Sequence, residues 1–493
     1  MKKINQSSIN TIILLAFMLL SASLTACEYT KRAQSNAATN SEIVKLADKS
    51  SYEIDARIVS NQILGNEIRM YGYNGQIPGP TLRVKKGSNI TINFKNSIDM
   101  PTTIHWHGIR LENRFDGVPD VTQKEVKPGQ SFTYQLKFPD GGIYWYHPHV
   151  REDIQQELGM YGAIIVESNF TPVDKEEVIF LDDIMLGRDG QIIEFYPDEP
   201  NFVLMGRFGN VMLVNGKTNY NLKVKAGEKI RLYIINSANT RVFNFKIIGV
   251  KLKVVGGDSG LYEKEFMAES VIISPSERIM VELQFEKPGT YEIVNSIPDY
   301  DYSLGKLVVE GESGFTLQLY NHTILDDKTR AQFNRPPDIT WQIGIKTSVQ
   351  MMNHMMETGH DGIEWEDTML MMNAMSDGSN TKWFIKDVAS GNENMDIKYN
   401  LKVGDIKKIR ITNDPNSAHP MQHPIHIHGQ RFLVLSVDGK PNDNLVWKDT
   451  VLVPTGKTVD ILIDFTNPGT WMFHCHIAEH FQSGMMGAIN VAE

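Results

Sequence analysis

Short runs in which apolar and polar residues alternate recur along most of the chain, separated by Gly, Pro and Asn. One run places Ile90, Ile92 and Phe94 on one face, and another does the same with Leu283 and Phe285. Successive side chains of a β-strand point to opposite faces of the sheet, so this alternation predicts strands that bury one face. Short strands with regular turn signals predict an all-β chain built of Greek-key β-sandwiches.

Two sequence blocks occur three times, in the same order. The first block begins Leu-x-Val, has a Gly soon afterwards and ends with an Asn nine residues after that Gly. Its copies begin at Leu82, Leu222 and Leu401 and end at Asn96, Asn236 and Asn413. The second block runs from a Phe through a Gly turn to an aromatic residue, at 138–144, 285–291 and 465–471. Because both blocks recur in one order, the sequence predicts three copies of one β-domain.

The N-terminus predicts export and a lipid anchor. Lys2 and Lys3 precede a short apolar run at 12–20, and Leu24-Thr25-Ala26-Cys27 follows. This order is typical of a signal peptide, and the last four residues resemble the lipobox of bacterial lipoproteins. The resemblance implies cleavage before Cys27 and lipid attachment to its thiol, which would anchor the exported protein in the cell envelope, on the periplasmic or extracellular side. An ordinary signal peptide or an uncleaved anchor is the alternative.

The pattern gives the following division of the chain. We expect a lipoprotein signal peptide at residues 1–27 and a flexible tether at 28–50, which is rich in Ala, Ser, Asn and Thr. Domains 1, 2 and 3 are expected at 51–168, 169–312 and 313–493. With lipid on Cys27 and metal on Cys475, the only two cysteines form no disulfide. The formal net charge of −10 argues against a nucleic-acid partner. No sequence feature defines an oligomeric state.

Histidines distinguish the three copies. Ten of the fourteen histidines lie in four clusters, each with a His-x-His pair. The pairs are His105/His107 and His147/His149 in domain 1, and His426/His428 and His474/His476 in domain 3. Domain 2 has Phe243-Asn244-Phe245 and then Val294 and Ser296 at the corresponding places. The difference predicts that domains 1 and 3 face each other and share a metal site, with domain 2 as a spacer without copper ligands.

The chemistry of the candidate ligands favours copper. A His-x-His pair on a strand points both imidazoles to one face, so eight converging imidazoles suit three metal ions. Cys475 points the other way, with His480 five residues on and Met485 ten residues on. With His423, these residues suit a blue-copper site with a weak axial Met. Zinc, the rival metal, explains isolated His/Cys sites but not this combination.

Four motifs carry a family resemblance, together with Ile77-Pro-Gly-Pro-Thr81. The motifs are His105-Trp-His-Gly, His147-Pro-His, His423-Pro-Ile-His-Ile-His-Gly and His474-Cys-His-(x3)-His480-(x4)-Met485. The chain resembles the bacterial three-domain multicopper oxidases of the laccase and cuprous-oxidase type. The resemblance implies three cupredoxin-like domains and four copper ions: one type 1, one type 2 and a type 3 pair.

The resemblance also implies residue roles. The implied type 1 ligands are His423, Cys475, His480 and axial Met485; the type 2 ligands are His105 and His426; the type 3 ligands are His107, His147, His149, His428, His474 and His476. Asp116 matches an acid near the type 2 copper, although its Asp-Gly pair also suits a plain turn. Phe481 stands where many bacterial relatives have a second proton-passing acid.

Methionines suggest the reductant. Eight of the 23 methionines fall in residues 351–375, within a segment at 350–376 that also holds several acidic residues. Thioether favours Cu(I), so the segment predicts an additional Cu(I) site; an adaptable apolar patch is the alternative. Met421 lies where cuprous oxidases place a substrate-site Met, and His419 lies where they place an acid.

The function predicted by these features is oxidation of Cu(I) or phenolic compounds coupled to reduction of O2 to water, in the service of copper tolerance. A copper-storage or envelope scaffold protein that kept the fold without turnover is the alternative. Two-domain copper nitrite reductases fit less well, because this chain has three copies and a complete set of type 3 ligands.

Overall fold

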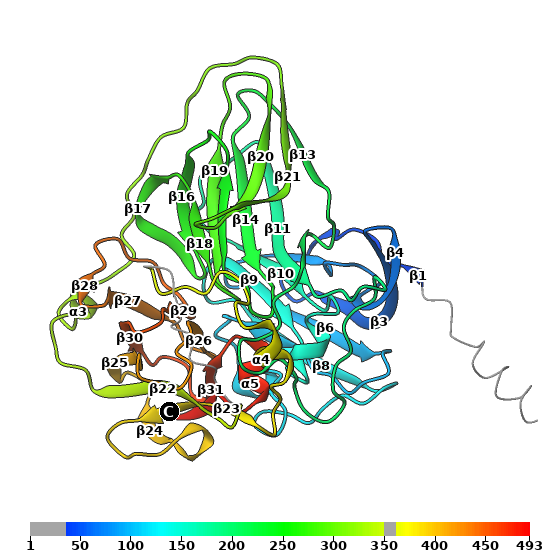
Figure 1. Ribbon diagram of the computed structural model, residues 1–493. Helices are drawn as coiled ribbons and strands as arrows, with labels where there is room; N and C mark the ends of the chain where they lie inside the picture. Colours follow the sequence, from blue (N-terminus) through cyan, green and yellow to red (C-terminus); the bar gives the residue numbers. More distant parts are fainter. Residues whose placement is uncertain (1–35, 350–360) are drawn as a thin grey trace, which may run out of the picture.

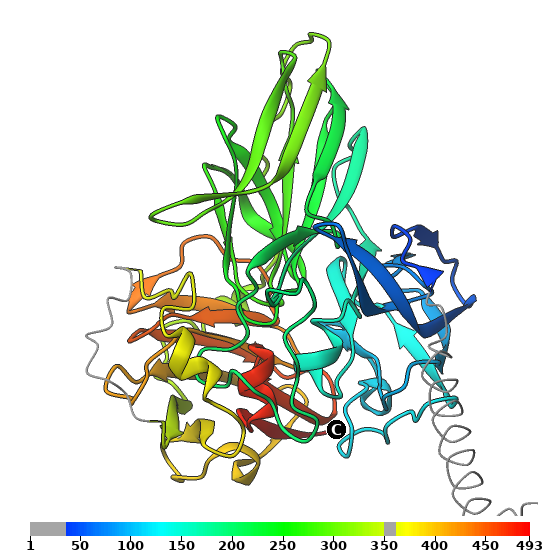
Figure 2. The same cartoon turned by 45° about the vertical axis from the view of Figure 1, so that its right-hand side comes forward.

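The structure, a computed structural model, describes residues 36–349 and 361–493. It consists of three β-sandwich domains, each made of two packed sheets (Figure 1). Domain 2 stands above domains 1 and 3, which lie side by side in both views (Figures 1 and 2). About half of the chain is strand and only 5% is helix, so the predicted all-β, cupredoxin-like fold is confirmed.

Domain 1 has two five-stranded sheets. One sheet contains β1 (Asn36–Ala37), β3 (Ser51–Ile63), β4 (Asn66–Tyr73), β6 (Asn89–Asn96) and β8 (Ser131–Lys137). The other has the order β2 (Ile43–Lys45), β5 (Thr81–Lys85), β10 (Gly162–Glu167), β9 (Gly142–His147) and β7 (His105–His107). A 3-10 helix η1 (Asn113–Phe115) and a one-turn helix α2 (Glu152–Gln155) interrupt the loops.

Domain 2 has a six-stranded and a five-stranded sheet. The first has the order β12 (Val211–Val214), β11 (Lys175–Ile184), β14 (Ile230–Asn236), β19 (Arg278–Leu283), β16 (Leu252–Gly257) and β17 (Gly260–Ala268). The second has the order β13 (Tyr220–Lys225), β21 (Asp301–Glu310), β20 (Gly289–Ser296), β15 (Phe243–Ile247) and β18 (Val271–Ile273).

Domain 3 repeats the strand order of domain 2. Its first sheet has the order β23 (Thr381–Asp387), β22 (Ile339–Thr347), β25 (Ile406–Asn413), β30 (Thr458–Asp464), β27 (Phe432–Val437) and β28 (Lys440–Pro441). Its second has the order β24 (Lys398–Lys402), β32 (Met486–Ala492), β31 (Gly469–Cys475), β26 (His423–Ile427) and β29 (Thr450–Val453). The remaining helices are α3 (Asp327–Arg330), α4 (Leu370–Ala374), α5 (Ala478–Gln482) and η2 (Asn394–Asp396).

The two repeated blocks meet in space in every domain. The N–H of the first block's Gly donates to the carbonyl of the second block's Phe. These bonds are Gly87 to Phe138 (2.7 Å), Gly227 to Phe285 (2.8 Å) and Gly404 to Phe465 (2.8 Å). All three glycines have φ between +84° and +91°, a conformation that disfavours other residues. The shared contact explains why the blocks recur together.

The repeated Asn closes each sandwich. Its side-chain amide donates to two carbonyls, one in the loop that follows it and one farther along the chain. In domain 2, Asn236 Nδ2 donates to the carbonyls of Arg241 and Ile273, both at 2.8 Å. In domain 3, Asn413 Nδ2 donates to the carbonyl of Met421 at 2.6 Å, immediately before the candidate copper ligands.

The predicted flexible tether is wrong over its C-terminal part. β1 pairs in parallel with β3, and β2 pairs in parallel with β5. Val44 and Leu46 pack against the core of domain 1. The polar composition of residues 28–50 concealed this short apolar run. Residues 1–35, which include the lipobox and Cys27, lie outside the described residues. In the described part of the chain, no helix is long and apolar enough to cross a membrane.

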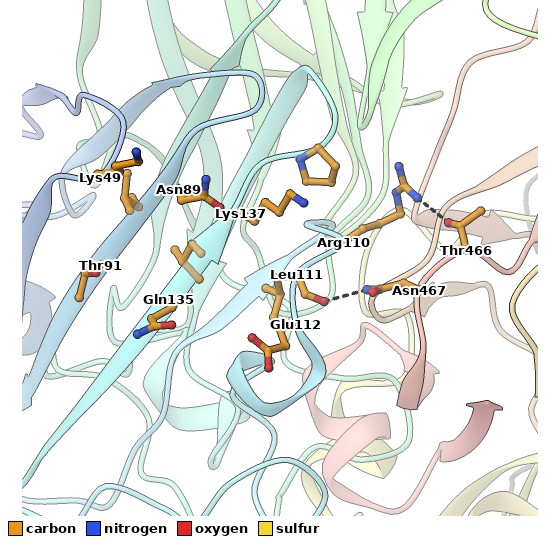
Figure 3. A pocket seen from close by; sticks show the side chains of 13 residues that line it. Lys49, Asn89, Thr91, Arg110, Leu111, Glu112, Gln135, Lys137, Thr466 and Asn467 are labelled. Carbon is orange, nitrogen blue, oxygen red and sulfur yellow. Dashed lines mark hydrogen bonds between the residues drawn. The ribbon is translucent and has the colours of Figure 1, made fainter. Parts of the chain in front are cut away.

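Polar contacts join domains 1 and 3 beside an open cleft of about 620 Å³ (Figure 3). Asn467 Nδ2 donates to the carbonyl of Leu111 at 2.8 Å, and Arg110 donates to the hydroxyl of Thr466 at 2.5 Å. The cleft is lined by residues such as Lys49 and Lys137, and none of the clustered histidines lines it. It therefore marks the boundary between the domains and not the candidate chemistry.

We predict that Asn236→Ala destabilises domain 2 by about 2–3 kcal/mol, because two buried carbonyls lose their donor. Urea unfolding of the copper-free protein, followed by circular dichroism, measures the change. Asn221→Ala, at an exposed position of the same domain, serves as the control. Equal midpoints for the two variants would contradict a closing role for the repeated Asn.

Candidate metal centres

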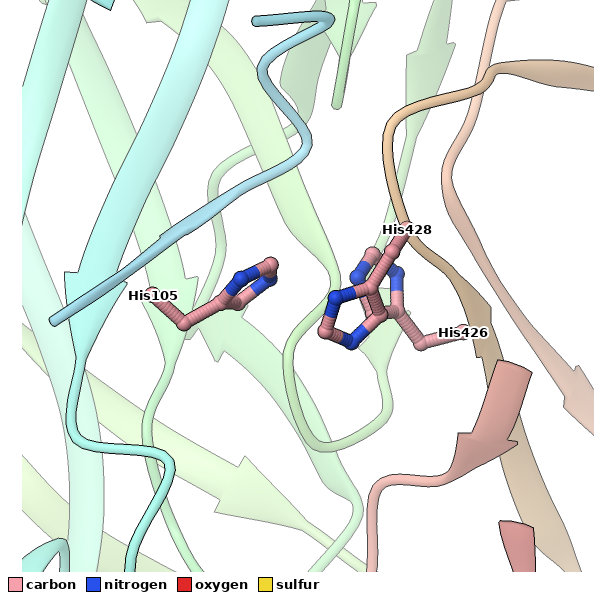
Figure 4. A group of neighbouring side chains, drawn as sticks. All are labelled: His105, His426 and His428. Atoms are coloured by element: carbon pink, nitrogen blue, oxygen red, sulfur yellow. The ribbon is translucent and has the colours of Figure 1, made fainter. Parts of the chain in front are cut away.

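Eight buried imidazoles converge between domains 1 and 3. They are His105, His107, His147, His149, His426, His428, His474 and His476, each at most 4% exposed. Strand pairing brings them together in twos: β7 and β9 set His105 opposite His147, and β26 and β31 set His426 opposite His474. Figure 4 shows His105 approaching His426 and His428 from the other domain. The predicted meeting of the four His-x-His pairs is thus present in the structure.

Imidazoles of different domains lie in direct contact. The rings of His105 and His428 stack with their centroids 4.0 Å apart, and those of His107 and His426 stack at 3.7 Å. His428 Nε2 and His474 Nε2 are 2.9 Å apart. Three groups each bring three ligand atoms within 4.8 Å of one another: His105/His426/His428, His105/His107/His147 and His149/His428/His474. This spacing suits several metal ions held by shared neighbours.

In most of these rings one nitrogen donates a hydrogen bond and therefore carries the proton. The other nitrogen is then left with a lone pair that can bind a metal ion. Backbone carbonyls accept from Nδ1 of His105, His147, His426 and His474, at 2.8 to 2.9 Å. Among the described residues, Nε2 of His105, His147 and His426 has no hydrogen-bond partner. Buried polar atoms normally have partners. Inward-facing nitrogens without them fit a site built to hold metal ions.

Burial favours the neutral form of seven of the eight clustered imidazoles. It lowers the pKa of His107, His147, His149, His426, His428 and His476 well below the ordinary value, and the neighbouring imidazoles lower each further. For His474 the pKa falls to about 3. Neutral imidazole is the form that binds metal.

A second group surrounds Cys475 on the opposite face of β31. Cys475 Sγ lies 3.5 Å from His423 Nδ1 and 3.9 Å from His480 Nδ1, and the two nitrogens are 3.3 Å apart. Burial raises the pKa of the Cys475 thiol. Bound metal would have to displace its proton, since the thiolate is the ligand. Met485 is fully buried, and its carbonyl accepts from the N–H of Cys475 at 3.1 Å.

Trp383 packs against both imidazoles of this group, which the sequence reasoning missed. Its ring stacks on His480 at 4.2 Å and meets His423 edge-on at 4.6 Å. Its indole N–H donates to the carbonyl of Val203 in domain 2 at 2.8 Å. The ring therefore excludes water from the Cys475 group and orients both ligands.

Asp116 contacts the imidazole cluster as the motif suggests. Asp116 Oδ2 accepts from His428 Nδ1 at 2.8 Å, and Oδ1 lies 3.4 Å from His105 Nδ1. One carboxylate from domain 1 thus touches a ring of each domain.

Glu152 is a second acid at the cluster, and the sequence reasoning did not find it. It begins α2, three residues after His149, and Oε1 lies 3.5 Å from His149 Nε2. It is fully buried, and neither carboxyl oxygen has a hydrogen-bond partner among the described residues. Burial, and then the charge of Asp153, raises the pKa of Glu152 well above the ordinary value. Phe481 lies nearby, with its ring 4.9 Å from that of His149.

A group of soft side chains adjoins the Cys475 site. His419 Nε2 lies 2.8 Å from the sulfur of Met205, which comes from domain 2. His419, Met205 and Met421 are all fully buried, and His419 Nδ1 has no partner in the described part of the chain. Burial lowers the pKa of His419 to about 4. Met205 carried no sequence signal, because its partner lies 214 residues away.

Part of the Met-rich segment is described. Residues 350–360, with Met351, Met352, Met355 and Met356, lie outside the described residues. In α4, Met372 is buried in the core of domain 3, whereas Met371 is 74% exposed. Met375, four residues after Met371, is 59% exposed. The described part of the segment therefore has packed and exposed methionines, and the additional Cu(I) site stays a prediction.

Three cupredoxin-like sandwiches that bury a cluster of eight imidazoles beside a Cys/His/His group define a copper protein of the oxidase class. Family models described as multicopper oxidase match residues 57–170, 188–318 and 366–493. The chain belongs to the multicopper oxidase family. It is accordingly an oxidoreductase, and its family implies type 1, type 2 and type 3 copper centres. The three matched domains exclude the two-domain copper nitrite reductases.

Relatives agree over nearly the whole chain. A multicopper oxidase of Staphylococcus aureus is 28% identical over 445 residues, which cover 87% of this chain and 85% of the relative. Copper resistance protein A of Escherichia coli is 24% identical and covers 87% of this chain and 91% of its own.

Solved structures agree as well. A multi-copper oxidase from Pseudomonas thermotolerans is 27% identical, with a TM-score of 0.69 over 91% of this chain and all of that one. The laccase-like CueO of Ochrobactrum sp. shares the fold, with 24% identity and a TM-score of 0.73 over 92% of this chain and all of that one.

Proposed function

We propose that the protein oxidises Cu(I) and small phenolic reductants at the Cys475 group and reduces O2 to water at the imidazole cluster. In this proposal His423, Cys475, His480 and Met485 hold type 1 copper, and His105 and His426 hold type 2 copper. The remaining six clustered imidazoles hold the type 3 pair. The carrying observation is that β31 supplies Cys475 to one group and His474 to the other, and that His476, the residue directly after the strand, also joins the second group.

Copper supplies one-electron chemistry at the first group and four-electron reduction of O2 at the second. The chain supplies the connection. Cys475 is bonded through the backbone to both neighbouring histidines, so the two groups are joined by a short covalent path. The register of β31 against β26 sets His474 opposite His426 and Cys475 opposite Ile425, which keeps the two groups on opposite faces.

Protons enter the cluster through two carboxyl groups in this proposal. Asp116 holds its position by accepting from His428 and serves the side of the type 2 ligands. Glu152 serves the side of the type 3 ligands, where Phe481 offers no proton. Burial raises the pKa of Glu152 well above its ordinary value, which favours the protonated carboxyl and suits a general acid.

His419, Met205 and Met421 form the proposed receiving point for Cu(I). Thioether is a soft ligand that favours Cu(I), and neutral imidazole also binds copper. His419 and Met421 lie four and two residues before His423, and Met205 contacts His419. One relative is named for copper resistance, which favours a role in copper tolerance. Phenolic compounds carry no such soft-ligand requirement and are expected to use the same electron entry.

Export and a lipid anchor on Cys27 complete the proposal. Eight residues separate Cys27 from Asn36, where pairing with domain 1 begins. Even fully extended, they hold domain 1 within about 30 Å of the membrane. The copper-storage alternative predicts the same anchor and the same metal content but no O2 uptake.

Cys475→Ser is expected to remove the blue absorbance and to abolish O2 uptake with Cu(I) or a phenol, because the thiolate is lost from the electron path. The cluster of imidazoles should keep its copper, which metal analysis measures. Wild-type protein that binds the full complement of copper yet consumes no O2 would instead support the storage alternative.

Met205→Leu is expected to lower kcat/KM for Cu(I) by about tenfold, in the range seen when a metal site loses one supporting contact. Phenol oxidation should remain within about twofold, since Leu conserves the packed volume. Met280→Leu, another fully buried methionine of domain 2, is the control. Parallel losses for both substrates would remove Met205 from the Cu(I) site.

Glu152→Gln is expected to slow reoxidation of the reduced enzyme by O2 by about 10²-fold, because the amide cannot donate the proton. Anaerobic bleaching of the blue colour by reductant should be unchanged. Asp153→Asn alters the neighbouring acid, which pairs with Arg151 and not with an imidazole, and serves as the control. Normal reoxidation in Glu152→Gln would contradict the assignment.

A further inference from the structure

The guanidinium group of Arg278, a residue of domain 2, lies at the junction of the three domains. Arg278, the first residue of β19, is 1% exposed and donates from Nε to the carbonyl of Ile143 in domain 1 at 3.0 Å. Its two terminal nitrogens bind the carboxylate of Asp449 in domain 3, at 2.6 and 2.5 Å. A second carboxylate, Asp258 of domain 2, accepts from the backbone N–H of Arg278 at 2.8 Å. Arg278 therefore ties all three domains at one point.

Asp449 in turn holds one imidazole from each metal-binding domain. Its Oδ1 accepts from His107 Nε2 at 2.9 Å, and its backbone carbonyl accepts from His426 Nδ1 at 2.8 Å. The hydroxyl of Thr450 lies 3.1 Å from His107 Nε2 and 3.2 Å from His426 Nδ1, and it donates to Asp449 Oδ1 at 3.0 Å. These are the two rings that stack at 3.7 Å. Asp449 and Thr450 thus align the pair.

The ion pair decides which nitrogen of His107 faces the cluster. A carboxylate only accepts hydrogen bonds, so the proton of His107 must be on Nε2. The lone pair is then on Nδ1, which has no hydrogen-bond partner among the described residues. His426 presents Nε2 by the same logic. A bidentate guanidinium holds a carboxylate in one plane, which a single ammonium contact does not achieve.

The backbone has made room for this contact. Gly108 follows His107 with φ of +83°, and a Cβ there would lie 2.3 Å from Asp449 Oδ2 and 2.8 Å from Arg278 Nη2. No side chain fits without displacing the ion pair. The Gly of the His105-Trp-His-Gly motif is therefore required by Arg278 and Asp449 as well as by the turn.

We propose that Arg278 is a positioning residue for the copper cluster: domain 2, which has no clustered imidazole, fixes Asp449 so that His107 and His426 present the correct nitrogens. The inference rests on the proposed roles of those two histidines. It changes the predicted role of domain 2 from a spacer to a part of the metal site that acts through Asp449.

The test compares the copper-loaded Arg278→Gln and Arg241→Gln variants. Arg241 is a matched control, because it is buried in domain 2, pairs with Asp183 at 2.6 Å and donates to the carbonyl of Trp365 in domain 3. Within residues 36–349 and 361–493 it contacts no histidine. We expect Arg278→Gln to lose cluster copper to a chelator at a concentration about 10–100-fold lower than wild type, with an altered type 2 electron paramagnetic resonance spectrum and unchanged blue absorbance per chain. Arg241→Gln should keep the wild-type spectrum and copper retention, whatever its thermal stability.

A conservative variant keeps the test decisive if Arg278→Gln does not fold. Arg278→Lys retains the charge but not the two-point contact, so its copper retention should fall between those of wild type and a full loss, with a shifted type 2 spectrum. Wild-type spectra and copper retention in the folded Arg278 variants, with reduced melting temperature alone, would overturn the inference and leave the proposed function intact. If the wild-type protein itself binds no cluster copper, the proposed function fails instead.

Discussion

The structure depends on burying eight imidazoles together at the boundary of two domains. Each ring loses water there, and a protonated ring would repel its neighbours, which is why the pKa of His107 and its neighbours falls so far. The cost is smaller for a ring that has a hydrogen-bond partner on one nitrogen and a metal ion on the other. Backbone carbonyls accept hydrogen bonds from several of the rings, so no further side chain is needed for them. Asp116 and Asp449 supply two more, one from each domain.

Most of the fold and of the ligand set is visible in the sequence. The repeated Gly and Phe predict three domains because they meet in one turn contact in each copy, and a His-x-His pair on a strand leaves little freedom in how it points. Short-range sequence patterns of this kind predict the local structure correctly. The polar stretch before Tyr52 is the exception. Its strand at 43–45 has only three residues, which is too short for an alternating pattern to be recognised in a polar sequence.

The residues that the sequence did not reveal act over long range. Glu152 lies three residues after His149, and this spacing alone is a weak signal in the sequence. Only the one-turn helix α2 of the folded chain brings its carboxyl group to the imidazole. Met205 and Arg278 belong to domain 2, which contributes none of the clustered histidines, and they contact residues more than 170 positions away. Their contribution follows from how domain 2 sits above the other two, and no periodicity encodes that placement. Domain 2 therefore contacts the candidate site through Met205 and Arg278 although it has none of the clustered histidines.

Anomalous diffraction at the copper absorption edge from crystals of the copper-loaded protein tests the central claim most directly. The account predicts one peak bounded by Cys475, His423 and His480, and three peaks among the eight imidazoles between domains 1 and 3. Copper peaks confined to one domain, or an imidazole cluster without copper while the Cys475 group is filled, would contradict it.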